Sequence, residues 1–489
     1  MAQHSRSSGN TLYWHDYETF GQDARRDRPA QFAGIRTDED LNIISEPLVL
    51  YCKPADDMLP APQACLINRI TPQIAREKGI PEAKFIGRIN QELSVPGTCG
   101  VGYNSLRFDD EVTRNSLYRN FFDPYAREWK NGNSRWDIID MLRLTRALRP
   151  QGITWPTHPD GKPSFRLEHL APANGLAHES AHDALSDVRA TIALAKLVRK
   201  VQPKLYDYVF QNRGKHAVSE KLDVYAKKQV LHVSRMYPAE QGCIAMVVPL
   251  ANDPVDKNSI IIYDLGTDPA PLLELSAEEI RERIFTPAEK LPQGVSRVPL
   301  KKVHVNKCPV IVPQSALRGG KSELVSIDAS VCEANLRIIA SADRLHTKIQ
   351  EVFSRKDFGE NSEDPDLCIY SGGFFSNRDR KAMERLHSLE PDQLGSMSGA
   401  FQDKRLPEML FRYRARNYPD MLSTEEKMRW EQYRRTRLTS PDGGGSITMD
   451  EYRTQLEKLR KEPGITDAAT KILDALTDYG NELLPEIQA

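Results

Sequence analysis

The sequence has few cysteines and none arranged in close pairs. Its seven cysteines stand at positions 52, 65, 99, 243, 308, 332 and 368, with no C-x-x-C pair. An odd, dispersed set argues against a disulfide framework and a structural zinc site, and it favours a reducing compartment. No apolar run is long enough to span a bilayer, and the first ten residues lack the apolar segment of a signal peptide. We therefore expect a cytoplasmic protein that does not bind membranes.

An excess of charge of one sign is also missing. Lys and Arg total 67, Asp and Glu total 68, and the formal net charge is −1 over 489 residues. This balance excludes a uniformly basic coat, so any binding of a polyanion must depend on a local surface. Internal repeats and low-complexity tracts are absent from the sequence. The length is sufficient for two or three domains with large cores.

The first part of the chain reads as an α/β domain. It spans residues 11–202 and follows a polar tail over 1–10 that we expect to be disordered. The stretch "TLYWHDYETFG" predicts a buried strand, and the apolar stretches around "TDED" are typical of a hairpin. In "AHDALSDVRATIALAKLVRK", apolar residues recur at helical spacing: Leu185, Val188, Ile192 and Ala195. The expected fold is a mixed sheet flanked by helices.

The pattern changes at Pro203. Short strands such as "QVLHVS", "CIAMVVPL", "SIIIYDL" and "KKVHVN" predict a small barrel-like or sandwich-like β domain with inserted helices over residues 203–353. The polar, breaker-rich stretch 354–366 is typical of a linker. Residues 367–489 are predicted to form a helical domain. The whole chain is thus predicted to be an α/β multidomain protein.

Two carboxylates lie together on the first predicted strand. Asp16 and Glu18 are two residues apart, so on a strand they point to the same face, where they repel one another among aromatic neighbours. A solvated edge strand would explain the pair alone. Three further residues follow in order, and each has its own ordinary explanation as a helix cap or surface group: Asp109 in "YNSLRFDDEV", then His182 and Asp187 in "SAHDALSDV".

Taken together, these five residues indicate a divalent metal site. Hard cations such as Mg²⁺ prefer oxygen ligands and neutralise carboxylates that otherwise repel. Two such ions about 4 Å apart can activate a water and stabilise the leaving oxygen in phosphodiester hydrolysis. In this hypothesis Asp16, Glu18 and Asp187 bind the metal directly, and Asp109 binds it through water. His182 is then placed to deprotonate the attacking water.

The three motifs resemble those of a known superfamily. "HDYETFG", "GYNSLRFDDEV" and "SAHDALSDVRATIAL" are similar to the exonuclease motifs of the DEDD superfamily in its histidine-bearing subtype, which has an RNase H-like fold. "NSRWDIIDMLR", "KPSFRLEHLAPANGL", "HVNKCPV", "GGFFSNRDR" and "YRARNYP" extend the resemblance over nearly the whole chain to the bacterial exonuclease I family. Proofreading subunits and oligoribonucleases lack the second and third regions.

The resemblance implies a specific activity and architecture. It implies a 3′→5′ exodeoxyribonuclease that hydrolyses single-stranded DNA with two Mg²⁺ ions, releases 5′-mononucleotides and acts in DNA repair and recombination. It also implies an RNase H-like domain, an SH3-like domain and a helical C-terminal domain that form a processive clamp within one chain, so a monomer is expected. The family docks the C-terminal tail of single-strand DNA-binding protein, for which Arg318 in "SALRG" is a candidate contact.

Contacts to single-stranded DNA should combine cations with aromatic surfaces. Arg166 in "SFRLEHL" is a candidate phosphate clamp, and Glu18 is expected to contact the substrate as well as the metal. Further candidates are Arg114, Tyr125, Trp129, Arg143, Lys215, Asn258, Lys301 and Asn306. Each could instead be an ordinary core or surface residue. Two other functions remain open: an RNA-trimming exonuclease of the same superfamily, and a non-catalytic module that binds single strands.

Overall fold

The chain forms two compact units. The computed structural model describes residues 9–177, 182–317, 325–355 and 364–484. The first unit contains described residues 9–134, 182–191 and 364–484, and the second contains 135–177, 192–317 and 325–355. The predicted tail at 1–10 and linker at 354–366 lie largely outside the described residues. Each compact unit thus contains segments that are distant in sequence. The predicted domains, by contrast, are continuous stretches of the chain.

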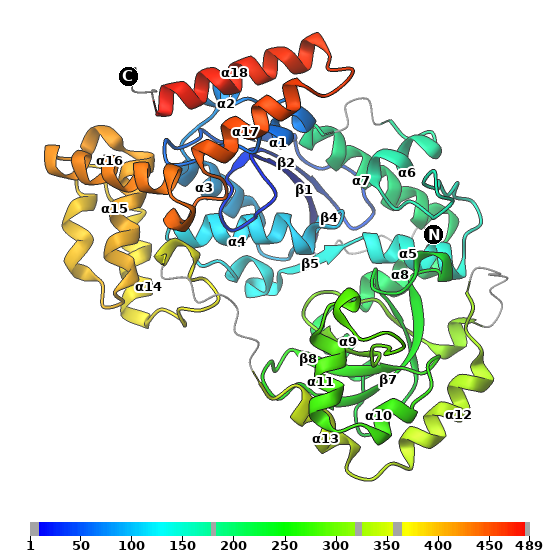
Figure 1. Cartoon of the computed structure of the whole chain (residues 1–489). Coiled ribbons are helices and arrows are strands. Elements are labelled where there is room, and N and C mark those ends of the chain that lie inside the picture. The colour runs from blue at the N-terminus through cyan, green and yellow to red at the C-terminus, as the bar shows by residue number, and fades with distance from the viewer. Residues whose placement is uncertain (1–8, 178–181, 318–324, 356–363, 485–489) are drawn as a thin grey trace. The chain divides into compact units, whose positions relative to one another are not determined.

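A mixed sheet lies at the centre of the first unit (Figure 1). The central strand β1 (Thr11–Thr19) pairs antiparallel with β2 (Pro29–Thr37) and parallel with β4 (Thr98–Gly102), and β3 (Leu48–Tyr51) pairs antiparallel with β2. On β1, Tyr13 and Tyr17 join the hydrophobic core beneath α3 (Glu82–Leu93) and α4 (Asp109–Arg119). Because side chains alternate along a strand, Asp16 and Glu18 lie on the opposite face.

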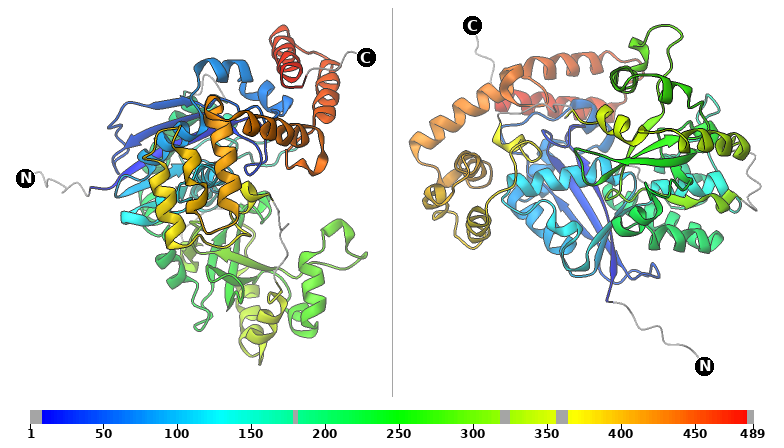
Figure 2. Two further views of the ribbon diagram at one scale, coloured as in Figure 1. Left: turned by 90° about the vertical axis from the view of Figure 1, so that its left-hand side faces the viewer. Right: turned by 90° about the horizontal axis from the view of Figure 1, so that it is seen from below.

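Helices from the end of the chain cover this unit. They are α14 (Asn377–Leu386), α15 (Arg405–Asn417), α16 (Thr424–Thr439), α17 (Met449–Arg460) and α18 (Asp467–Leu483). In Figures 1 and 2, α17 and α18 lie beside α1 (Pro62–Asn68) and α2 (Pro72–Lys78). The predicted helical character of this segment is confirmed.

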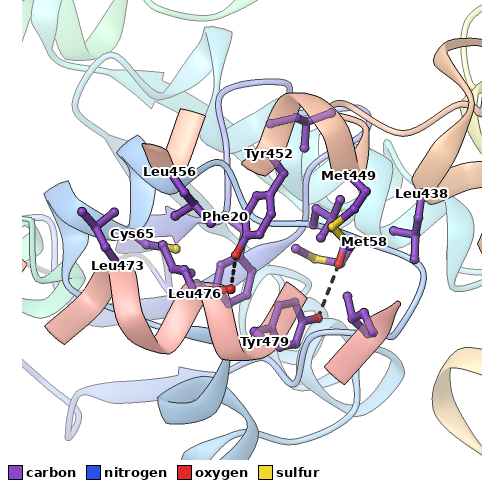
Figure 3. Packing of buried hydrophobic residues seen from close by; sticks show 14 of the residues in the cluster. Phe20, Met58, Cys65, Leu438, Met449, Tyr452, Leu456, Leu473, Leu476 and Tyr479 are labelled. Carbon is purple, nitrogen blue, oxygen red and sulfur yellow. Dashed lines mark hydrogen bonds between the residues drawn. The ribbon is translucent and has the colours of Figure 1, made fainter. Parts of the chain in front are cut away.

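The α17–α18 pair shares one hydrophobic core with the early helices (Figure 3). Leu473 and Leu476 of α18 and Tyr452 of α17 pack in the same cluster as Phe20 and Cys65. Two buried hydroxyl groups find backbone acceptors: Tyr452 donates to the carbonyl of Leu476 at 2.6 Å, and Tyr479 donates to that of Met58 at 3.4 Å. The core therefore has its polar atoms satisfied as well as its volume filled.

A buried ionic cluster also joins the late helices to the first part of the chain. Asp57 is fully buried and lies 2.8 Å from Arg416, 3.5 Å from Arg437 and 4.0 Å from Arg28. Arg416 also pairs with buried Asp366 at 2.8 Å. Burial alone would raise the pKa of Asp57, but the three guanidinium groups outweigh it and hold the pKa well below its usual range. The two segments thus share buried charges that neither can satisfy alone.

The second unit is built on an antiparallel sheet. Its strand order is β10-β6-β7-β8-β9, with β6 (Val230–Val233), β7 (Ile244–Asn252), β8 (Ser259–Asp264), β9 (Leu300–His304) and β10 (Ile311–Pro313). Each neighbouring pair is antiparallel. These strands match the four predicted segments and add β10. The helix α9 (Lys215–Lys221) packs on this sheet through Val218.

Other helices of the second unit come before and after these strands in the sequence. α5 (Ile139–Leu148), α6 (Leu167–Ala173) and α8 (Pro203–Gln211) precede it, after the short strand β5 (Ser134–Asp137). Later helices are α10 (Ala270–Glu274), α11 (Ala277–Phe285), α12 (Ala329–Ala340) and α13 (Leu345–Val352). The long helix α7 (Ala184–Val201) begins in the first unit and ends in the second. Among the described residues, no helix is long and apolar enough to cross a membrane.

We predict that Leu476→Ala destabilises the first unit. The substitution removes a fully buried side chain from the shared core, so the free energy of unfolding should fall by about 2–5 kcal/mol. Denaturant unfolding followed by tryptophan fluorescence measures the loss. The matched control is Ile465→Ala, at an exposed position, where the change should stay within about 0.5 kcal/mol. Equal stability of the two variants would contradict the shared core.

Candidate active site

Asp16 and Glu18 form the centre of the site. Both are half-buried on one face of β1, and a β-bulge lies directly after Glu18 in the pairing with β2. Burial raises the pKa of Asp16 well above its usual range, and the negative charges of Asp109 and Asp187 raise it further. Burial followed by repulsion from Asp187 and Asp109 raises the pKa of Glu18 to about 9. The site therefore disfavours ionised carboxylates unless a cation is present.

Asp109 reaches this face through a backbone contact. The pairing of β1 with β4 stops at Trp14 and Val101, and β4 ends at Gly102. Beyond that point the N–H of Tyr17 donates to Asp109 Oδ1 at 3.1 Å instead of to a strand. Asp109 is also the first residue of α4, as the sequence predicts. Because the pairing with β4 stops before Tyr17, the N–H of Tyr17 is available to position Asp109.

The start of α7 brings His182 and Asp187 to the same site. One ligand atom each from Glu18, His182 and Asp187 lie within 4.8 Å of one another. His182 has a φ of +65°, a left-handed conformation that is uncommon for a residue with a Cβ. Such backbone strain gathers at functional sites, where the surrounding structure holds it in place.

Two residues that the sequence analysis did not single out hold the start of α7. Gln31 lies opposite Glu18 in the β1–β2 register, and its amide donates to Asp183 Oδ1 and accepts from the N–H of Ala184, both at 3.2 Å. Asp183 in turn accepts the N–H of Ser186 at 3.2 Å, as a helix-capping residue does. These contacts tie the helix that carries Asp187 to the strand beside the one that carries Glu18.

Other missed residues adjust the charge of the site. Asp183 adds negative charge beside both Asp16 and Glu18. A side-chain hydrogen bond between Asn68 and Glu18 opposes the rise in the pKa of Glu18, and Asn68 also donates to the carbonyl of Thr19 at 3.0 Å. In the sequence, only the position of Asp183 directly after His182 hinted at a role. Gln31 and Asn68 carry no signal of their own.

The donor set fits a divalent cation. Carboxylate oxygens crowded together, with their pKa values raised by burial and then by mutual repulsion, are the ligands that hard cations stabilise. Glu18, His182 and Asp187 are the group whose ligand atoms converge, while Asp16 and Asp109 border it through their charges. The structure therefore brings all five predicted residues into one cluster in the first unit.

Three residues of the first unit are predicted to contact DNA, and one of them, Arg114, is paired with acids. Arg114 donates to both oxygens of Glu128 at 2.7 and 2.8 Å and to Glu111 at 2.7 Å, and it lies 5.4 Å from the Tyr125 ring. Trp129 is 67% exposed. An exposed indole is well suited to stack on a base. The DNA contacts of Arg114, Tyr125 and Trp129 remain predictions.

The predicted contacts of the second unit differ in how accessible they are. The side chain of Arg166 is 65% exposed, with Glu168 3.5 Å away. Arg143 is buried and pairs with Asp140 at 2.6 Å. Lys215 donates a hydrogen bond to Asn258, and Lys301 donates one to Ser234. Asn306 is exposed. Arg318 lies outside the described residues.

Three family models match successive parts of the chain. Family models described as Exonuclease, Exonuclease I SH3-like domain and Exonuclease I C-terminal domain match residues 13–195, 213–355 and 363–483. The chain is 46% identical over 475 residues to exodeoxyribonuclease I of Escherichia coli (strain K12), covering 97% of this chain and 98% of that protein.

Solved structures agree as well. A moderately thermophilic exonuclease I from Methylocaldum szegediense is 55% identical with a TM-score of 0.93, covering 97% of this chain and 99% of that one. The E. coli exonuclease I complex with a dA16 oligonucleotide is 45% identical with a TM-score of 0.93, covering 97% and 100%. The E. coli enzyme is also known in a zinc-bound complex with single-stranded DNA (45% identical, TM-score 0.91, covering 97% and 99%).

The fold and the acidic cluster therefore define a metal-dependent hydrolytic exonuclease, with a mixed-sheet exonuclease domain, an SH3-like domain and a helical C-terminal domain. The identity to full-length relatives is more specific than this class. The chain belongs to the exodeoxyribonuclease I family.

We predict that Mg²⁺ stabilises the protein more strongly as pH rises. The pKa of Glu18 is about 9 in the folded chain against an ordinary 4.5, so between these values the metal-free folded state binds more protons than the unfolded state. Its stability therefore falls as pH rises through that window. Binding of a divalent ion needs the ionised carboxylates, so the gain in melting temperature should grow between about pH 5 and pH 8.

Thermal unfolding with excess Mg²⁺ or EDTA at each pH measures this gain. Glu18→Gln removes the titrating group and serves as the control, in which the dependence on pH should weaken. A gain in melting temperature that does not vary with pH in the native protein would contradict the metal site.

Proposed function

We propose that the chain hydrolyses single-stranded DNA from its 3′ end with two Mg²⁺ ions and releases 5′-mononucleotides. The observation that carries the proposal is the convergence of Glu18, His182 and Asp187, with Asp16 and Asp109 beside them, on one face of the central strand. Identity to exodeoxyribonuclease I over nearly the full length supports the substrate and the direction. A DEDD-type constellation on an exonuclease fold supports the reaction type.

The side chains divide the work of the reaction between them. Asp16, Glu18 and Asp187 would hold the metal, and Asp109 would contact it through water. When bound, the metal lowers the barrier by activating water and stabilising charge on the scissile phosphate. His182 accepts the proton of the attacking water, since an imidazole exchanges protons readily near neutral pH. Gln31 and Asp183 keep the start of α7 in register with β1 during this step.

The DNA strand is held by residues outside the acidic cluster. We assign Arg166 to the phosphate near the scissile bond, because its side chain is 65% exposed and its contact with Glu168 is as long as 3.5 Å. Exposed Trp129 and partly buried Tyr125 would stack on bases. Arg114, Arg143, Lys215, Asn258, Lys301 and Asn306 complete the proposed contacts. Glu18 would also contact the terminal nucleotide.

The wider assignments rest on the family. We propose a cytoplasmic monomer that works in DNA repair and recombination, with domains at 11–202, 203–353 and 367–489. A solved structure described as SSB/Exonuclease I with an inhibitor is 44% identical with a TM-score of 0.88, covering 97% of this chain and 100% of that one. It supports single-strand DNA-binding protein as a partner, and Arg318 stays the proposed contact for the tail of that protein. RNA trimming is the alternative substrate, and strand binding without cleavage is the alternative activity.

Digestion of end-labelled nucleic acids tests the function. We expect 5′-labelled single-stranded DNA to shorten progressively from its 3′ end, with duplex DNA resistant and EDTA abolishing the reaction. Matched single-stranded RNA serves as the comparison substrate. Faster loss of RNA would favour the trimming alternative, and binding without any cleavage in Mg²⁺ would favour the non-catalytic one.

We predict that His182→Ala separates catalysis from strand binding. Loss of a general base costs about 10²- to 10⁴-fold in rate, so turnover should fall by that factor. Affinity for single-stranded DNA, measured by fluorescence anisotropy in EDTA, should change little. The matched variant Asp187→Asn removes a metal ligand and should abolish Mg²⁺-induced stabilisation as well as turnover. A parallel loss of rate and affinity in His182→Ala would make His182 a structural residue.

A further inference from the structure

An open groove of about 530 Å³ lies on the second unit. It is lined by α9, by the segment that follows this helix, and by residues at or next to the ends of β7, β8 and β9. Its apolar lining comes from buried residues of the unit's hydrophobic core: Leu222, Val224, Ile260 and Val305. Its rim carries Lys215, Lys257 and Tyr225. The groove thus joins an apolar floor, an aromatic ring and two cations within one unit.

Tyr225 is the most unusual residue of the rim. It is 93% exposed, yet its backbone is fixed, because the N–H groups of Tyr225 and Ala226 donate to Asp223 Oδ1 at 2.9 and 3.0 Å. Folding therefore gains almost no burial from this ring, although the turn holds it at the groove. A positioned aromatic ring left in water is a ready surface for stacking.

One side of the groove favours an anionic ligand. Lys215 donates to Asn258 Oδ1 at 2.7 Å, and this neutral amide does not cancel its charge. Lys257 is exposed and also lines the groove. Two acids, Glu220 and Asp223, line it as well, so the positive charge is confined to the side formed by the two lysines. Phosphate is therefore attracted to the Lys215–Lys257 side of the groove.

We propose that this groove binds one nucleotide of a DNA strand, 5′ of the end that is being hydrolysed. The base stacks on Tyr225 above the apolar floor, and its phosphate lies at Lys215 and Lys257. The proposal rests on the proposed function, and it adds Tyr225, Lys257 and a base-binding pocket to the predicted contacts. Stacking accepts any base, which suits an enzyme that must pass every sequence.

Binding measurements on three variants test the groove. Tyr225→Ala should weaken binding of a long 5′-fluorescein-labelled oligothymidylate in EDTA by roughly five- to ten-fold, the lower range for loss of one stacked base. Tyr225→Phe keeps the ring and should bind as the native protein does. Lys257→Ala should weaken binding and flatten its dependence on salt. Lys290→Ala, at another exposed lysine of the same unit, is the matched control and should change neither quantity.

A scan with one abasic nucleotide identifies the base. In the native protein, an abasic site at one position should weaken binding about as much as Tyr225→Ala does, and in Tyr225→Ala that position should cause no further loss. An abasic penalty that persists unchanged in Tyr225→Ala, or native affinity of that variant, overturns the proposal. An acidic peptide that binds the native protein but not Lys257→Ala, with no effect of the abasic scan, also overturns it.

The two proposals fail in different ways. Lys290→Ala, at a residue that does not line the groove, should digest single-stranded DNA at the native rate, whereas Tyr225→Ala should need a higher DNA concentration to reach half its maximal rate. Native digestion of single-stranded DNA together with an unchanged abasic profile in Tyr225→Ala rejects the groove alone. Absence of digestion by the native protein rejects the proposed function.

Discussion

Repulsion among acids on one face of β1 is the constraint on which the first unit depends. A carboxylate that is both half-buried and surrounded by like charges is costly in its ionised form, and here Asp16 and Glu18 share that cost with Asp109 and Asp187. Hydrogen bonds from Tyr17, Gln31 and Asn68 hold the arrangement in place. The fold thus maintains a site whose charge is balanced only when a cation joins it.

The sequence predicted the residues proposed for the chemistry of the site, but not the residues that hold them in place. Asp16 and Glu18 could be placed on one face because strand periodicity is local, and the order of the later motifs supplied Asp109, His182 and Asp187. Gln31 and Asn68 could not be found, because their roles depend on the β1–β2 register and on a loop contact that no spacing reveals. The strands and helices were largely predicted, whereas the grouping of 364–484 with the first unit depends on tertiary packing.

Charge pairing changes how the basic residues of the chain should be understood. Arg114 and Arg143 lie in acid pairs, so their presence in basic stretches overstates the positive charge that they offer. Arg166, Lys215 and Lys257 are more exposed. With a net charge of −1, affinity for a polyanion must come from a few such cations together with exposed rings.

The ionic cluster around Asp57 has a consequence for how the protein can be divided. Arg416 and Arg437 come from the late helices, while Asp57 and Arg28 come from the first part of the chain. A chain that ends before residue 364 would leave Asp57 with Arg28 as its only partner among these, and would uncover the apolar surface that α17 and α18 bury. The helical segment and the catalytic sheet are therefore expected to unfold together rather than as independent parts.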